Sequence, residues 1–197
     1  MPIKLTARNL DMLPDGVAAP RYDAAALRGG ILHFGVGNFH RSHEAVYLDD
    51  LFNLGDDRDW AIVGAGVLEA DAAGRDRLKR QDWLTTVVEQ DATHMSARVT
   101  AAMIDYLEPG DTDAIVARLA DPAIRIVSLT ITEGGYFIDP ATGSFNAAHP
   151  AIVADCDNPD APKTVFGLIV AGLKRRKAAG IAPFTVMSCD NIPHNGV

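Results

Sequence analysis

Short apolar runs alternate along the chain with stretches of helical periodicity. The predicted strands lie at residues 31–34, 60–67, 124–131 and 184–188. The predicted helices lie at residues 38–52, 71–80, 111–120 and 164–179. The run at 60–67 is apolar on both faces, as expected of a central parallel strand covered by helices. The alternation predicts an α/β fold with a doubly wound, mostly parallel sheet and helices on both faces.

The remaining segments are less regular. Two further runs, at 84–88 and 99–104, are apolar or β-branched, and either can be a strand. Residues 1–28 contain prolines and little apolar periodicity, which predicts an arm packed on a domain formed by residues 29–197. That domain ends in a polar loop rather than in a helix or strand, so we expect a second, C-terminal domain to be absent from this chain.

Two stretches in the second half of the chain have uncertain roles. Residues 137–162 are rich in Asp, Pro, Asn and Gly, and they are predicted to be a long surface loop with no more than a helical turn around Ile152. Four basic residues from Lys174 to Lys177 end the last predicted helix. Because cations stabilise the negative end of a helix, we interpret this cluster as helix termination rather than as an anion site.

The first predicted strand leads into a glycine turn and the start of a helix. Gly35 can form a tight left-handed turn, and Gly37 allows the backbone to approach a ligand without a Cβ in the way. Free N–H groups at the helix start suit a pyrophosphate, which favours a dinucleotide. The third glycine of the usual fingerprint is replaced by His40, however, and two glycines in such a turn are common in any α/β protein. The residues predicted to contact the cofactor here are Gly35, Val36, Gly37, Asn38, Phe39, His40 and Arg41.

Two acidic residues follow the second predicted strand. Glu69 and Asp71 are placed where a carboxylate accepts hydrogen bonds from the ribose hydroxyls of NAD and repels the 2′-phosphate of NADP. Their spacing from Gly37 is longer than usual, and they could equally be solvated acids that open the next helix. Arg75 and Arg77, nearby, could still receive a 2′-phosphate.

Composition and charge narrow the classes of partner. The formal net charge of −8 argues against nucleic acid or an anionic membrane as the main partner, because both require a basic face. No apolar run approaches the roughly 18 residues needed to span a bilayer, and the first residues lack a secretion signal. Two cysteines, Cys156 and Cys189, cannot form a disulfide framework, so we expect free thiols and a cytoplasmic protein.

Other candidate chemistry is weaker. His40 and His43 lie three residues apart, a spacing that could hold a metal, but no third ligand is near in sequence, so we predict no metal site. Cys189 and His194 could form a nucleophilic pair, but no oxyanion site accompanies them. Tyr136 lacks the lysine four residues later that a self-contained short-chain reductase would need, because Pro140 occupies that position.

Three segments together resemble one known family. They are Gly35 to Arg41 with the following His43, Ala45, Tyr47, Leu48 and Asp49; the loop Thr132 to Tyr136; and the loop Ser188 to Asn191 with Asn195 and Gly196. In this order and spacing they resemble the mannitol dehydrogenase family, the polyol-specific long-chain dehydrogenases and hexuronate reductases. The resemblance covers residues 31–196, and the histidine at position 40 is typical of that family.

The resemblance implies a Rossmann-like, NAD-binding half of a longer, metal-independent oxidoreductase. Such enzymes interconvert a secondary alcohol of a polyol or sugar acid and its ketone by hydride transfer to or from NAD. It implies that Asn191 holds the substrate oxygen and that Thr132, Glu133 and Gly134 lie where nicotinamide and substrate meet. The general-base lysine belongs to the C-terminal domain, so the present chain is expected to be inactive alone. A catalytically silent nucleotide-binding module remains the alternative.

Overall fold

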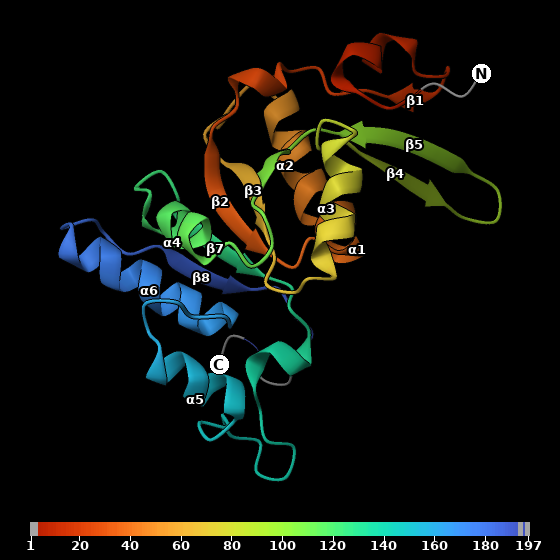
Figure 1. Cartoon of the computed structure of the whole chain (residues 1–197). Coiled ribbons are helices and arrows are strands. Elements are labelled where there is room, and N and C mark those ends of the chain that lie inside the picture. Colours follow the sequence, from red (N-terminus) through yellow and green to blue (C-terminus); the bar gives the residue numbers. More distant parts are fainter. Residues whose placement is uncertain (1–3, 193–194, 196–197) are drawn as a thin grey trace.

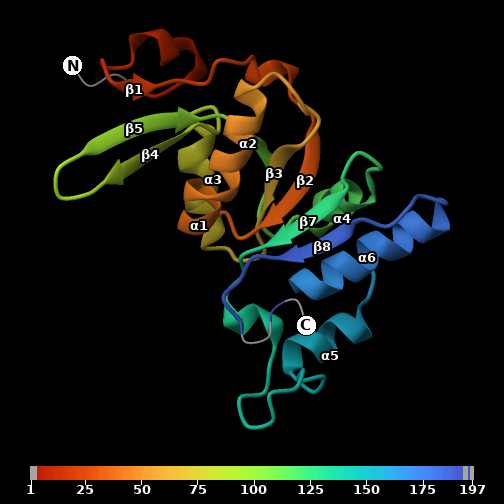
Figure 2. The same cartoon turned by 180° about the vertical axis from the view of Figure 1, so that it is seen from behind.

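A five-stranded parallel sheet forms the centre of the molecule. The computed structural model describes residues 4–192 and residue 195. The strand order is β6-β3-β2-β7-β8, and every neighbouring pair is parallel (Figures 1 and 2). The strands are β2 (Gly29–Phe34), β3 (Ala61–Ala65), β6 (Met103–Tyr106), β7 (Ile126–Leu129) and β8 (Thr185–Ser188).

Helices cover both faces of this sheet. The helices of the molecule are α1 (Asn38–Ser42), α2 (Glu44–Asn53), α3 (Asp71–Lys79), α4 (Thr112–Ala120), α5 (Pro150–Asp157) and α6 (Val165–Ala178), and of these α5 packs on α6 rather than on the sheet. Successive side chains of a strand point to opposite faces. Accordingly, Ile31 packs in one core with residues of α2 and α3, whereas Leu32 packs in a second core with residues of α4 and α6. The predicted doubly wound α/β fold is therefore confirmed.

A smaller sheet lies beside the main one. It joins β1 (Val17–Ala18), β5 (Met95–Thr100) and β4 (Thr85–Gln90), and β4 and β5 form an antiparallel hairpin that projects from the domain (Figure 1). The prediction that residues 99–104 form a single strand is therefore wrong. That run ends one strand of the small sheet and, after Ala101 and Ala102, begins β6 of the main sheet. The first 28 residues also contain two 3-10 helices, η1 (Ala7–Met12) and η2 (Ala24–Ala26).

Three local expectations are corrected. The helix predicted over 38–52 is broken at His43, whose backbone leaves the helical region with φ −126° and ψ −76°. The loop predicted over 137–162 contains α5, which Pro150 opens in its first turn while the side chain of His149 accepts a hydrogen bond from the Ala151 amide. Because proline is favoured at the first position of a helix, this start could have been recognised.

The third correction concerns one member of the basic cluster at the end of α6, since Arg175 and Lys177 lie in the last turn of the helix as the prediction of helix termination requires. Arg176 is 3% exposed, and its guanidinium donates hydrogen bonds to the backbone carbonyls of Leu119, Asp121, Ile124 and Ala182. It therefore joins α6 to the segment between α4 and β7 and does not act mainly on the helix dipole. Within the described residues, no helix is both long and apolar enough to cross a membrane.

Candidate functional site

A groove of about 550 Å³ opens at the carboxyl ends of the central strands. Gly35 follows β2, Gly66 follows β3 and Thr130 follows β7, and all three line it. From β2 the chain passes to β3 on one side and, later, to β7 on the other. This is the switch point at which open α/β sheets bind ligands. The groove also includes Asp71, Thr132 and Gly134 among the residues expected to contact a cofactor.

The two glycines of the first turn have different structural roles. Gly35 has φ +94°, and a Cβ there would lie 2.0 Å from the carbonyl oxygen of Thr130. Only glycine fits this turn, as its predicted role requires. Gly37 has φ −97°, and a Cβ there would approach only the Gly35 oxygen, at 3.7 Å. The space beside Gly37 is therefore open to a ligand.

The rest of the first cofactor segment divides between surface and interior. The guanidinium of Arg41 donates to the Gly37 carbonyl, at 3.2 Å, and to the side-chain oxygen of Asn38, so this pair braces the turn. Phe39 is about half exposed, and its ring packs on His43. His40 is fully buried, so its side chain cannot touch a cofactor, and the prediction of a cofactor contact for this side chain is wrong. The backbone amide of Val36 makes no hydrogen bond within the described residues.

The two acidic residues after β3 differ in their surroundings. A carboxylate oxygen of Asp71 accepts a hydrogen bond from the Leu68 amide at 3.1 Å, and the residue lines the main groove. Glu69 is exposed and lines an adjoining cavity of about 430 Å³. Arg75 is engaged elsewhere, because it donates to the Tyr106 carbonyl and pairs with Glu108 at 2.8 Å. It is therefore a poor candidate for binding a 2′-phosphate.

The Thr132 loop and the Asn191 loop lie at the same end of the sheet. Phe34, Leu129 and Ser188 are in register across β2, β7 and β8, so the turns that follow them leave the same edge. The Cys189 amide extends this pairing by donating to the Leu129 carbonyl. Asn191 itself is exposed at this edge. The sheet thus brings the Gly35 turn, the Thr132 loop and Asn191 to one rim.

Asp190 holds the two loops together. Its carboxylate accepts hydrogen bonds from the backbone amides of Ile131 and Thr132, both at 2.9 Å, and from the Tyr136 hydroxyl at 2.8 Å. Thr132 has φ +62°, a strained conformation for a residue with a side chain. Partial burial raises the pKa of Tyr136 to about 12; the hydrogen bond with Ser188 lowers this pKa and the hydrogen bond to Asp190 raises it, so the hydroxyl stays protonated. The sequence reasoning assigned no role to Asp190.

The Asn191 loop is closed on its other side by Asn195, whose side-chain amide donates to the Asp190 carbonyl at 2.8 Å. Glu133, in the short 3-10 helix η3 (Glu133–Tyr136), is exposed at the rim. The Cys189–His194 pair is not described, because His194 lies outside the described residues. Gly196 lies outside them too.

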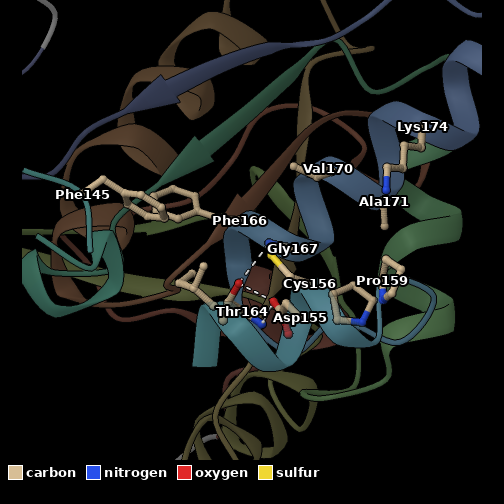
Figure 3. Close-up of a pocket in the computed structure, with 12 residues that line it drawn as sticks. Phe145, Asp155, Cys156, Pro159, Thr164, Phe166, Gly167, Val170, Ala171 and Lys174 are labelled. Carbon is tan, nitrogen blue, oxygen red and sulfur yellow. Dashed lines mark hydrogen bonds between the residues drawn. The ribbon is translucent and has the colours of Figure 1, made fainter. Parts of the chain in front are cut away.

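A second cavity, of about 400 Å³, lies between α5 and α6 and has a largely apolar lining (Figure 3). Beside it, Asp155 accepts hydrogen bonds from the Thr164 amide and hydroxyl, and Thr164 in turn caps α6 by accepting from the Gly167 amide. The ring of Phe166 lies between this cavity and the rim and packs against Tyr136, with ring centroids 5.9 Å apart. Phe166 therefore connects the wall of this cavity to η3.

Beneath the Gly35 turn lies a polar cluster that includes His33, which the sequence reasoning missed. The rings of His33 and His40 are stacked with centroids 4.2 Å apart, and both approach one carboxylate oxygen of Glu44. Among the residues described, His33, His40 and Glu44 are the group whose potential metal-ligating atoms all lie within 4.8 Å of one another. Ser128 also donates to the same carboxylate, so the cluster is a hydrogen-bond network. The prediction of no metal site stays a prediction.

A family model described as the mannitol dehydrogenase Rossmann domain matches residues 29–197. The chain belongs to the mannitol dehydrogenase family. Its similarity to mannitol 2-dehydrogenase of Cereibacter sphaeroides is 55% identity over 181 residues, which is 91% of this chain and 38% of that protein. It is 48% identical to the polyol:NADP oxidoreductase of Gluconobacter oxydans, over 98% of this chain and 40% of the relative.

Solved structures of relatives have the same fold. A mannitol 2-dehydrogenase of Pseudomonas fluorescens, in a ternary complex with NAD and D-mannitol, matches with a TM-score of 0.95 and 49% identity. A substrate-free D-sorbitol dehydrogenase matches with a TM-score of 0.90 and 46% identity. Each match covers 98% of this chain and 40% of the other, so the chain spans about two fifths of the length of these family members. The predicted family resemblance is confirmed.

Proposed function

We propose that this chain is the NAD-binding part of a metal-independent polyol dehydrogenase. The observation that carries the proposal is the turn after β2, in which Gly35 lines the switch-point groove and the space beside Gly37 is free for a phosphate. Membership of the mannitol dehydrogenase family supports it, as does the relative solved with NAD and D-mannitol. The full reaction is the oxidation of a secondary alcohol of a polyol or sugar acid to a ketone, or its reverse.

Residues in and beside the groove suit the parts of a dinucleotide. The Val36 amide, which has no hydrogen-bond partner in the part of the chain that is described, and the open backbone at Gly37 suit the pyrophosphate. The exposed carboxylate of Glu69 is our first choice for the adenosine ribose, because Asp71 already accepts a hydrogen bond from the Leu68 amide. Thr132 to Gly134 would contact the nicotinamide. NAD is favoured over NADP, since a carboxylate repels a 2′-phosphate.

The Asn191 loop suits the substrate. NAD, when bound, would accept a hydride from the carbinol carbon. A neutral amide N–H group at Asn191 can stabilise the negative charge that develops on the substrate oxygen as its proton leaves. Glu133 lies on the neighbouring loop of the same rim. We assign the general base to a lysine of the C-terminal part of the longer protein, so this chain alone binds cofactor and does not turn over.

The setting of the protein follows the same proposal. The partners are a small polyol or sugar-acid substrate and the C-terminal domain of the longer protein, with no role for nucleic acid or a membrane surface. Cys156 is exposed and both cysteines are free thiols, as suits a cytoplasmic protein.

Kinetics of the longer protein with mannitol and NAD test this function. We expect Asn191→Ala to lower kcat by about 10²-fold, the effect of losing one donor to a developing oxyanion, while NADH binding is unchanged. Asn158→Ala, at an exposed position that ends α5, is the matched control and should leave kcat unchanged. Wild-type turnover by Asn191→Ala would contradict the assignment. NADH binding without turnover of any polyol or sugar acid by the longer protein would favour the silent nucleotide-binding module.

A further inference from the structure

A buried network lies directly beneath the Gly35 turn and connects it to α2 and β7. His33, near the end of β2, is 0% exposed. Its Nδ1 lies 2.8 Å from Ser128 Oγ and 3.0 Å from Glu44 Oε2. Its Nε2 lies 3.1 Å from the Gly35 carbonyl oxygen and 3.0 Å from Thr130 Oγ1. Both ring nitrogens therefore have two polar partners each.

The partners of Nε2 require that it carries a proton. The Gly35 carbonyl can only accept a hydrogen bond, and the Thr130 hydroxyl donates its single hydrogen to that same carbonyl at 2.6 Å. Thr130 Oγ1 therefore has only lone pairs left for the imidazole. With acceptors on both sides, the Nε2 of His33 must be the donor.

The partners of Nδ1 require the same. The Ser128 hydroxyl donates to Glu44 Oε1 at 2.8 Å, so it too offers the ring only lone pairs. Burial alone would raise the pKa of Glu44, but hydrogen bonds from His33 and His40 lower it below its ordinary value, so Glu44 is a carboxylate. With Glu44 as a carboxylate, this geometry has both nitrogens of His33 donating, which is the arrangement of an imidazolium paired with Glu44.

His40 does not compete for this proton. Burial, and next the positive charge of His33, lower the pKa of His40 to about 4, so its ring is neutral near pH 7. Its Nδ1 lies 3.4 Å from the Glu44 carboxylate, and its Nε2 has no hydrogen-bond partner among the described residues. The one positive charge of the cluster therefore belongs to the ring that contacts the Gly35 turn.

This charge acts on one carbonyl group. The Gly35 oxygen accepts from the Gly37 amide, the Thr130 hydroxyl and the His33 imidazolium. A trans peptide is planar, so its N–H points opposite to its C=O. Fixing the Gly35 carbonyl toward His33 therefore fixes the Val36 N–H in the opposite direction, and that amide has no partner within the described residues.

We propose that protonated His33, held by Glu44, is a positioning residue of the dinucleotide site that aims the Val36 amide at the pyrophosphate. This inference rests on the proposed function, because it assumes that NAD(H) binds in the groove. His33 does not touch the cofactor, since it is fully buried. Its contribution is to remove the freedom of the Gly35–Val36 peptide before the ligand arrives.

The protonation state can be tested on the unmodified chain. A long-range ¹H–¹⁵N NMR spectrum of ¹⁵N-histidine-labelled protein near pH 7, assigned with His33→Gln, should show both ring nitrogens of His33 carrying hydrogen. His40 should show one protonated nitrogen. A spectrum in which His33 has one unprotonated nitrogen would overturn the proposal.

The positioning role is tested by NADH fluorescence titration. We expect His33→Gln to raise the Kd for NADH by about tenfold, because a charge-assisted hydrogen bond to the turn is lost. In the longer protein the KM for NAD should rise similarly, while kcat changes by less than about twofold, because the reacting atoms are not touched. His94→Gln, at an exposed position in the β4–β5 hairpin, is the matched control and should leave both constants unchanged.

The outcomes separate this inference from the function on which it rests. If wild type fails to bind NADH, the proposed function fails. If wild type binds and His33→Gln binds equally well, only the positioning role fails. Should His33→Gln not fold, Glu44→Gln decides the question, because it removes the carboxylate that pairs with His33 and does not line the groove. A folded Glu44→Gln protein with wild-type affinity for NADH would overturn the proposal.

Discussion

Alanine at Gly35 should destabilise the fold, whereas alanine at Gly37 should leave the fold intact and weaken NADH binding. At Gly35 the left-handed backbone costs an alanine roughly 1–2 kcal/mol. The new Cβ would also lie 2.0 Å from the Thr130 carbonyl oxygen, and a backbone shift that relieves such crowding costs about 1–3 kcal/mol. With a total of about 3 kcal/mol, and about 2–4 °C of Tm for each kcal/mol in a chain of this size, Gly35→Ala should lower Tm by roughly 6–12 °C.

Gly37→Ala should leave the fold intact. The backbone at Gly37 suits alanine, and the nearest atom to the new Cβ would be the Gly35 oxygen at 3.7 Å. Loss of freedom in the unfolded chain should even add about 0.4–1 kcal/mol of stability. The methyl group would occupy the approach of the pyrophosphate, however, so we expect the Kd for NADH to rise at least about tenfold, as the role of this glycine requires.

Thermal unfolding followed by circular dichroism, together with NADH fluorescence titration of the same samples, measures both effects. A Gly37→Ala protein that binds NADH with wild-type affinity would refute the assignment of this turn to the pyrophosphate. A Gly35→Ala protein with an unchanged Tm would refute the argument from φ and from Thr130.

Three further predictions concern the loops, the core and acid. Asp190→Asn replaces one carboxylate oxygen, which accepts a hydrogen bond from a backbone amide, by an NH₂ group that cannot accept one. It should lower the free energy of unfolding by about 1–3 kcal/mol and reduce kcat of the longer protein. A kcat at the wild-type value would count against a positioning role. Arg176→Met should cost about 3 kcal/mol or more in urea unfolding by leaving buried carbonyls unpaired, whereas exposed Arg175→Met should cost almost nothing; equal costs would contradict the structure. The pKa of His40 falls to about 4 on folding, so the unfolded chain binds this proton at a higher pH than the folded protein does. The free energy of unfolding should therefore fall by about 3 kcal/mol from pH 6.5 to pH 4, and the lowered pKa of Glu44 should extend the loss below pH 4. A flat profile between pH 6.5 and pH 4 would be inconsistent with a neutral buried His40.

Features that depend on local backbone geometry could be predicted from sequence. The order of strands and helices follows from apolar runs and their periodicity, and the left-handed turn at Gly35 follows from its place between a strand and a helix start. The shared rim of the Gly35, Thr132 and Asn191 loops follows from the rule that parallel strands end at one edge. These predictions needed no knowledge of distant contacts.

The remaining features depend on tertiary contacts. His33 looks like one polar residue in an apolar strand, and only the fold brings Glu44 and Ser128 to it. A buried histidine needs partners, which is the one signal that could have marked it. The burial of Arg176 depends on carbonyls more than 50 residues away in sequence for three of its four hydrogen bonds. The break at His43 involves neither proline nor glycine.

A crystal structure of this chain with NADH would test the central claim most directly. We expect the pyrophosphate to lie against the backbone of Val36 and Gly37, and the nicotinamide to lie beside Thr132 to Gly134 with Asn191 facing it. A dinucleotide bound elsewhere, or a nicotinamide turned away from Asn191, would contradict the account.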